Sequence, residues 1–198
     1  MSNKYIIVVL ALVLSFLCAS AVSAQNEWTG NVNAFLGRKT LDRSDWEPAE
    51  RQGELGIEID FRQKDWPISI AIDVMGASGK GDVVDPLFGT IDTFKSRTSE
   101  FNIGVRKIWE GAALVRPFIG GGLSYMRAEA EVSIPGFGSH TESDSGVGIW
   151  LGGGVYFTLG DHFNLGLELK YSKADVTIAG VDTDAGGNHF GILAGYHW

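Results

Sequence analysis

The chain has 198 residues, with 16 Lys and Arg against 24 Asp and Glu, one Cys, 27 Gly and a mean hydropathy of +0.06. This length allows one domain, or two small ones, with a sizeable core. The net charge of -8 argues against a nucleic-acid partner, because phosphate binding requires a basic surface. A hydrophobic share of 44% excludes a disordered chain, and only 5 Pro beside so many Gly exclude a collagen-like one.

Residues 1–24 have the pattern of a secretory signal peptide. Lys4 supplies a positive charge, Tyr5 to Cys18 form an apolar stretch, and Val22-Ser23-Ala24 resembles a cleavage site. We therefore predict cleavage after Ala24 and a mature domain over residues 25–198; a retained helical anchor is the alternative. The mature domain contains no Cys, so its stability must come from packing or from a membrane rather than from disulfides.

Beyond this segment, apolar residues recur with a period of two, which is typical of strands with one apolar face. The first stretch, Trp28 to Leu36, shows the alternation most weakly. The other seven stretches run over residues 55–62, 68–75, 101–106, 115–125, 147–157, 165–171 and 190–198. No later segment is long and apolar enough for a membrane helix, because the longest uncharged stretch, 145–160, is interrupted by five glycines.

The strand face opposite the apolar one decides between a soluble sandwich and a membrane barrel. One face is uniformly bulky and apolar, whereas the other mixes Gly with charges, as the cramped interior of a small barrel requires. The sequence therefore predicts an all-β, eight-stranded antiparallel up-and-down transmembrane β-barrel. A soluble barrel of the lipocalin kind is the alternative. The predicted lumen charge network consists of Glu58, Asp60, Arg62, Asp73, Arg106, Arg116, Glu168 and Lys170.

The connections between the predicted strands alternate in length. Those at 63–66, 109–114 and 160–162 are short, whereas those at 37–52, 77–95, 132–144 and 179–188 are longer and polar. Short periplasmic turns and longer extracellular loops are the asymmetry expected of outer-membrane barrels. Four Trp residues fall at strand ends on the short-turn side, where they predict a periplasmic aromatic girdle. These residues are Trp28, Trp66, Trp109 and Trp198.

Three segments, Pro117–Tyr125, Gly152–Phe157 and Leu165–Ser172, resemble the small eight-stranded outer-membrane β-barrel superfamily of Gram-negative bacteria, which includes the OmpA transmembrane domain and the OmpX/Ail type. Tyr196 and Trp198 at the C-terminus resemble the signal that the barrel assembly machinery recognises in that family. The resemblance implies a monomer in the outer membrane, surrounded by lipid and lipopolysaccharide. It is specific for architecture and weak for function.

The sequence favours a structural or surface-interaction role without catalysis, in which paired lumen charges close the barrel interior. A narrow small-solute pore and a lipid A-modifying enzyme are the alternatives. The deacylase-like barrels carry a His-x-Ser pattern, whereas Gly191 stands where the Ser after His189 belongs, so we predict a solvated or rim histidine there. Acidic residues in the predicted outer loops would bind cations associated with lipopolysaccharide, or another cell. They are Asp42, Asp45, Glu47, Glu50, Asp82, Asp85, Asp92, Glu142, Asp144, Asp182 and Asp184.

Two further motifs are incomplete, and we predict no cofactor and no metal. Gly79-Lys80 is reminiscent of a phosphate-binding loop, but Gly81 replaces its Ser or Thr and no strand–helix context surrounds it. Asp182 to Asn188 begins like a calcium loop, but Gly186 occupies the third ligand position. Tight-turn chemistry explains those Asp and Gly residues more simply than a bound cation.

Overall fold

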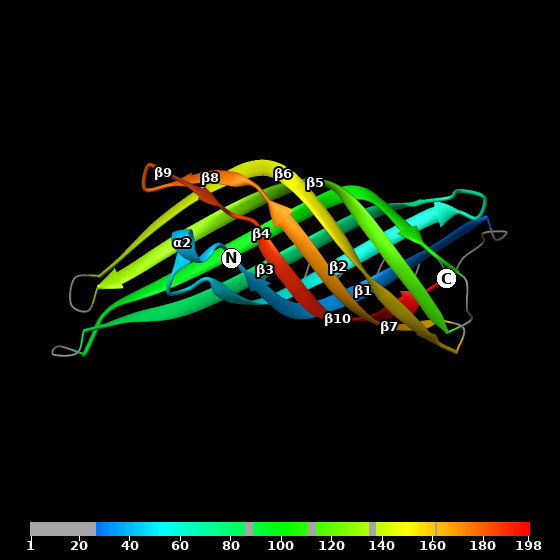
Figure 1. Ribbon diagram of the computed structural model, residues 1–198, viewed down its shortest axis with the longest axis horizontal. Coiled ribbons are helices and arrows are strands. Elements are labelled where there is room, and N and C mark those ends of the chain that lie inside the picture. The colour runs from blue at the N-terminus through cyan, green and yellow to red at the C-terminus, as the bar shows by residue number, and fades with distance from the viewer. Residues whose placement is uncertain (1–26, 86–88, 111–113, 135–137, 161) are drawn as a thin grey trace.

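The computed structural model describes residues 27–85, 89–110, 114–134, 138–160 and 162–198, and the predicted signal peptide lies outside them. Eight antiparallel strands close into a barrel in the order β1–β10–β7–β6–β5–β4–β3–β2 (Figure 1). The first barrel strand closes the ring by pairing with the last, with Val32 opposite Tyr196. The predicted eight-stranded antiparallel barrel is therefore confirmed.

The barrel strands are longer than the alternating stretches of the sequence. They are β1 (Trp28–Thr40), β2 (Arg51–Gln63), β3 (Ser69–Asp85), β4 (Gly89–Ile108), β5 (Val115–Ile134), β6 (Gly138–Leu159), β7 (Phe163–Lys173) and β10 (Gly187–His197). A short helix, α2 (Arg43–Trp46), lies between β1 and β2, and a hairpin of β8 (Asp175–Ile178) and β9 (Val181–Asp184) lies between β7 and β10. Within the described ranges, the chain has no helix of the length and hydropathy needed to cross a membrane.

The bulky apolar face points outward on every barrel strand. Val147 is 72% exposed, Leu169 65% and Leu55 64%, although burial of such side chains is normally favourable. The alternate positions point into the lumen and are buried, as the alternating burial along β7 shows. An outward apolar belt around a polar interior needs lipid as its solvent. It also excludes the alternative of a soluble lipocalin-like barrel, whose apolar face would point inward.

The two ends of the barrel differ, as the connection lengths predict. We call the end with the short connections 64–68, 109–114 and 160–162 the turn end, and the opposite end the hairpin end. At the hairpin end, β3, β4, β5 and β6 extend as long hairpins, and α2 and the β8–β9 hairpin lie at the same end (Figure 1).

The predicted loops at 77–95 and 132–144 are wrong, because β3 to β6 run through most of both ranges. Lys80 still pairs with Lys95, and the register of β3 on β4 shifts only between Val83 and Val84. Ala130 pairs with Glu142 in a ladder without a shift. The predicted loop 179–188 is likewise shortened by β9 and by the start of β10. Backbone hydrogen bonds continue wherever strands stay adjacent, whereas apolar alternation stops where the outward face leaves the lipid. Hydropathy alone therefore underestimates strand length.

A cluster of apolar side chains, the apolar cap, covers the lumen at the hairpin end. The indole Nε1 of Trp46 on α2 donates to the carbonyl oxygen of Asp184 at 2.8 Å, which joins α2 to β9. Asp42 caps α2 by accepting from the backbone N–H of Ser44 at 2.9 Å. The cap consists of Leu41, Trp46, Met126, Ala128, Ala130, Ala174, Val176 and Ala185.

Candidate functional site

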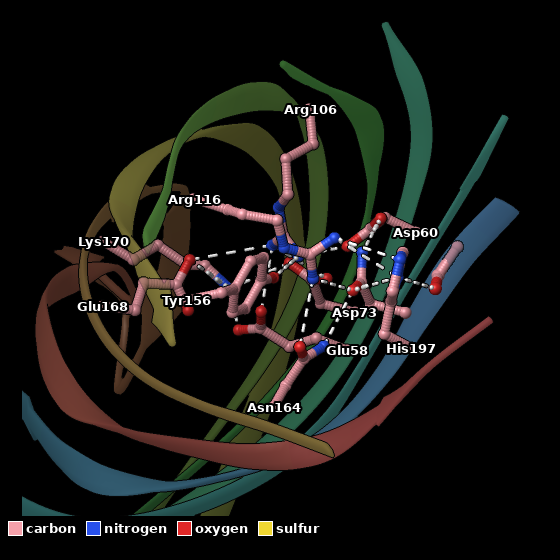
Figure 2. A network of polar contacts seen from close by, with 12 residues as sticks. Glu58, Asp60, Asp73, Arg106, Arg116, Tyr156, Asn164, Glu168, Lys170 and His197 are labelled. Carbon is pink, nitrogen blue, oxygen red and sulfur yellow. Dashed lines mark hydrogen bonds and ion pairs between the residues drawn. The ribbon is translucent and has the colours of Figure 1, made fainter. Parts of the chain in front are cut away.

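The middle of the lumen holds a buried ion-pair network, the central cluster, made of Glu58, Asp60, Asp73, Arg106, Glu168 and Lys170 (Figure 2). Arg106 projects from β4, and its Nη2 lies 3.0 Å from Glu58 Oε2 and 3.5 Å from Asp73 Oδ1. Its Nη1 lies 3.4 Å from Asp60 Oδ2 and donates to the Tyr156 hydroxyl at 3.1 Å. One guanidinium therefore joins acidic side chains from two neighbouring strands.

Lys170 on β7 completes the central cluster from the opposite side of the lumen. Its ammonium donates to Asp73 Oδ2 at 2.8 Å and to Glu58 Oε1 at 3.0 Å. Glu168 Oε1 lies 3.7 Å from Arg106 and 3.8 Å from Lys170, which is ion-pair distance without a hydrogen bond. Because buried charges are tolerable only when they are paired, these contacts tie β2, β3, β4 and β7 together across the interior.

The other two predicted lumen charges lie nearer the turn end. Arg116 donates to Asn31 at 2.8 Å and to Asn164 at 3.0 Å, and its Nη1 lies 3.3 Å from both ring nitrogens of His197. These four residues form the turn-end cluster. Arg62 is outside both clusters: its guanidinium donates to Glu110 at 2.6 Å and to backbone oxygens of the β2–β3 connection. The prediction that Arg62 shares one network with the other charges is wrong, because Arg62 lies at the mouth of the barrel, where exposed partners are available.

A third polar layer, the hairpin-end cluster, lies between the central cluster and the apolar cap and was not predicted. Lys39 Nζ on β1 lies 2.6 Å from Glu100 Oε1 and also donates to the carbonyl oxygen of Ala185. Both side chains are buried to about 1% exposure or less. The alternation of the sequence contains a signal for both residues. Lys39 lies an even number of residues from the inward-pointing Phe35 on β1, and Glu100 lies two residues from the inward-pointing Asn102 on β4.

His189 belongs to this hairpin-end cluster, so the prediction of a solvated or rim histidine is wrong. Its Nδ1 lies 2.8 Å from Glu54 Oε1, and its Nε2 lies 2.8 Å from the Ser172 hydroxyl. A serine, an imidazole and a carboxylate in that order are the parts of an activated nucleophile. However, Glu100 also accepts from Ser172 at 3.2 Å, and the side chains of His189 and Glu54 are fully buried. The apolar cap covers this layer from the hairpin end.

Acidic side chains at the hairpin end serve mainly to assemble that end. Asp144 accepts from the backbone N–H of Thr177 at 2.8 Å, and Glu142 accepts from that of Ala179 at 2.6 Å, so both hold the β8–β9 hairpin beside β6. The hydrogen bond from Thr177 lowers the pKa of Asp144. A hydrogen bond with His140, and then the one from Ala179, lower the pKa of Glu142. These carboxylates are therefore ionised structural acceptors.

The predicted aromatic and assembly residues lie at the turn end. The exposed fractions of Trp28, Trp66 and Trp109 are 41%, 38% and 48%, and the rings of Trp28 and Trp66 pack edge to face with centroids 5.6 Å apart. Tyr196 stacks on His162, and the Trp198 carbonyl accepts from the backbone N–H of Gly30. Exposed aromatic rings at one level of a barrel suit a membrane interface.

The incomplete motifs have structural roles. Gly79 and Lys80 lie within the β3 strand, with Lys80 opposite Lys95, and not in a loop that could surround a phosphate. Asp184 accepts from the backbone N–H groups of Ala174 and Gly186 at 3.2 and 2.8 Å. Among the described residues, no three His, Cys, Asp or Glu side chains gather in a way that could hold a metal ion.

The sequence matches the family model described as outer membrane protein beta-barrel domain over residues 9–198. Solved structures share the fold at low identity. One is Ail, the attachment invasion locus protein of Yersinia pestis, in complex with the heparin analogue sucrose octasulfate. It is 13% identical to this chain and superposes with a TM-score of 0.57, covering 87% of this chain and 99% of Ail. A major outer membrane protein of Thermus thermophilus is 13% identical with a TM-score of 0.55, over 86% and 99% of the two chains. Neisserial surface protein A is 13% identical with a TM-score of 0.53, over 86% and 95%. No curated protein sequence matches the chain.

Proposed function

Because the chain belongs to the outer membrane protein β-barrel domain family, we propose that it is a closed outer-membrane barrel with a structural or surface-interaction role and no catalytic activity. In this arrangement the turn end faces the periplasm and the hairpin end faces the cell exterior. The observation that carries the proposal is the filling of the lumen by successive layers of paired polar side chains beneath an apolar cap.

The layers oppose conduction in different ways. The central cluster places Arg106 and Lys170, both fully buried, across the bore of an eight-stranded barrel, which side chains nearly fill. An ion passing through would have to separate these pairs in a medium of low dielectric constant. The apolar cap then offers no polar contact to replace a hydration shell. Both barriers would have to move before a small solute could cross.

Planar-bilayer recording of the full chain tests closure. We expect conductance at the baseline of protein-free bilayers. The variants Glu58→Gln and Arg106→Gln each remove a charge from the centre, and Arg97→Gln, on the exposed outer face, is the control. Stable channels in the unmodified protein, with a conductance altered by the central variants and unaltered by the control, would contradict a closed lumen and favour the narrow-pore alternative.

Surface interaction is proposed for the hairpin end, which carries exposed acidic side chains on a fixed scaffold. Ail was crystallised with a polyanionic heparin analogue. The exposed charged side chains on the β8–β9 hairpin of this chain are acidic and would repel such a polyanion. We therefore propose a cationic partner, either divalent cations associated with lipopolysaccharide or a basic surface. Asp175 and Asp182 on the β8–β9 hairpin are exposed. Cells that display Asp175→Asn and Asp182→Asn should adhere less to polylysine than cells displaying the unmodified barrel; equal adhesion would argue against this partner class.

The contact between Ser172 and His189 supports a second candidate, a hydrolase reached by opening of the apolar cap. A fluorophosphonate reagent labels activated serines and would test it on the folded protein. Labelling that is lost in Ser172→Ala and in His189→Gln would favour the enzyme. Absence of labelling under conditions that label a known serine hydrolase would favour the closed structural barrel.

Export and assembly complete the proposal. We propose that residues 1–24 are removed on export and that Tyr196 and Trp198 bind the barrel assembly machinery, which inserts the chain as a monomer. N-terminal sequencing of the membrane-extracted protein should begin at Gln25. Replacing Trp198 by Ser should lower the amount of folded barrel in the outer membrane, whereas replacing the exposed Trp28 by Ser should lower it less.

A further inference from the structure

A groove of about 650 Å³ lies on the outer surface of the barrel; Glu54 of the hairpin-end cluster lines it, and no residue of the central cluster does. Its apolar floor includes Leu36 on β1 and Leu55 on β2, both more than half exposed. It exists because Gly53 and Gly76 point outward without side chains, and a Cβ added at either would meet no atom within 4 Å. Pockets of this volume hold lipid- or drug-sized molecules.

The groove lies at the hairpin-end boundary of the apolar belt. At this boundary the continuous apolar belt ends, strand by strand, at Leu36, Leu55, Val74, Phe101, Tyr125, Val147, Tyr171 and Phe190. The outward positions beyond these residues lead, where one occurs, to the first charged side chain of the strand. In β6 and β10 none occurs, whereas the other six of the eight strands all carry a basic residue there, although the sequence has more acidic than basic residues. We call these exposed residues the basic ring: Arg38, Arg51, Lys80, Arg97, Arg127 and Lys173.

A ring of cations at this level matches the anionic headgroups of the surrounding leaflet. Two of its members, Arg97 and Arg127, line the groove itself. Arg97 is paired with Glu129 at 2.6 Å and lies 3.7 Å from Glu131. Arg127 donates at 2.9 Å to the neutral hydroxyl of Ser143, and in the described part of the chain no carboxylate lies at ion-pair distance from it. Arg127 is therefore the cation that the groove presents to a ligand.

We propose that this groove is a binding site for one lipid of the outer leaflet with an anionic, phosphate-bearing headgroup. An acyl chain lies along Gly53 and Gly76 between the Leu36 and Leu55 side chains, and the phosphate binds the Arg127 guanidinium. Arg suits this role because its planar fork donates two parallel hydrogen bonds to one phosphate. The site depends on membrane location alone, so it stands or falls independently of whether the lumen is closed.

Native mass spectrometry of the full chain, folded in detergent, tests the site by counting retained lipid. The probes are dimyristoyl phosphatidylglycerol, dimyristoyl phosphatidylcholine and inorganic phosphate. The first should bind at one lipid per barrel, and about tenfold more tightly than the zwitterionic lipid. Phosphate alone should neither bind stably nor displace it at equal concentration. Equal retention of the two lipids, or displacement by phosphate at that concentration, would overturn the proposal.

Matched variants separate the groove from the ring as a whole. Arg127→Gln removes the headgroup contact and Gly76→Leu fills the groove without changing charge; each should weaken phosphatidylglycerol binding roughly tenfold. Lys173→Gln removes a ring cation on β7, outside the groove, and Ala194→Leu places an outward leucine on β10; both variants should bind as the unmodified protein does. Equal losses in Arg127→Gln and Lys173→Gln would overturn the proposal in favour of general surface attraction. Unchanged binding in a folded Gly76→Leu variant would overturn it as well.

Discussion

Replacing Arg106 by Met should destabilise the barrel more than any exposed charge replacement. The guanidinium is fully buried and lies 3.0 Å from Glu58, 3.4 Å from Asp60, 3.5 Å from Asp73 and 3.7 Å from Glu168. Met fills much of the same volume, so the variant removes the charge with little change in packing. It leaves four carboxylates with Lys170 as the one remaining cation of the central cluster.

The size of the effect follows from these distances. At an effective dielectric constant of about 20, each contact is worth roughly 5 kcal/mol of gross attraction, most of which offsets the desolvation of the charges. Removing one partner of a buried pair leaves that desolvation uncompensated, which typically costs about 3–5 kcal/mol. For comparison, Arg97 pairs with Glu129 at 2.6 Å on the exposed face, where such pairs contribute about 0–1 kcal/mol.

Urea unfolding of Arg106→Met and Arg97→Met, followed by tryptophan fluorescence in lipid vesicles, measures both costs. The double variant Arg106→Met, Asp60→Asn should recover part of the loss, because among the described residues Arg106 is the one cation at ion-pair distance from Asp60. If Arg106→Met costs no more than the Arg97→Met control, or if the double variant is less stable than the single one, the ion pairs of the central cluster do not stabilise the barrel.

Three other perturbations test separate parts of the structure. The pKa values of Glu142 and Asp144 are lowered in the folded protein, so their carboxylates stabilise the β8–β9 hairpin at pH values above the unfolded pKa of about 4. This stabilisation is lost as the pH falls through the folded pKa values, so amide exchange in β8 should accelerate on acidification. Asp144→Asn should show faster exchange already at neutral pH. Trp46→Ala should leave a cavity in the apolar cap and destabilise it by about 3–5 kcal/mol. Limited proteolysis should then cleave the chain faster at α2; unchanged cleavage would contradict the docking of α2. Gly191→Val should destabilise the barrel by about 1–3 kcal/mol, since an added Cβ would lie 2.5 Å from the Phe35 ring and 2.7 Å from the Leu36 carbonyl oxygen. In thermal melting, Phe35→Ala in the double variant should restore only part of this loss, because the clash with the backbone oxygen remains.

Side-chain parity explains why the fold could be predicted from the sequence. In a barrel, alternate residues have different solvents, and the outward ones must be apolar across the lipid. Leu165, Leu167 and Leu169 against Gly166 and Glu168 show this directly, and all three leucines are exposed on β7. Where the outward face leaves the lipid, at Lys80 or Glu129, no apolar face remains to mark the strand. The lengths of the long hairpins therefore cannot be predicted from apolar alternation.

The contents of the lumen were only partly predictable, for a related reason. Parity places Glu58 and Arg106 inside, but it does not give the depth of a side chain along the barrel. It therefore groups Arg62 with the central charges, although Arg62 pairs with Glu110. The predicted loop over residues 179–188 places His189 at the rim of the barrel. Once β10 is known to begin at Gly187, the same parity rule places His189 inward, opposite Lys170 across the strand pair.

The basic ring shows what parity adds when the ends of the apolar belt are also known. In sequence order its six members are scattered among acidic neighbours, such as Asp42, Glu50 and Asp82, and the chain reads as uniformly acidic. Sorting side chains by face and then by distance from the belt separates two populations. Cations occupy the outward positions next to the lipid, and carboxylates such as Asp144 and Asp184 hold the hairpin end together above it. Net charge averages over both populations, so an acidic total is compatible with an anionic lipid bound at the edge of the apolar belt.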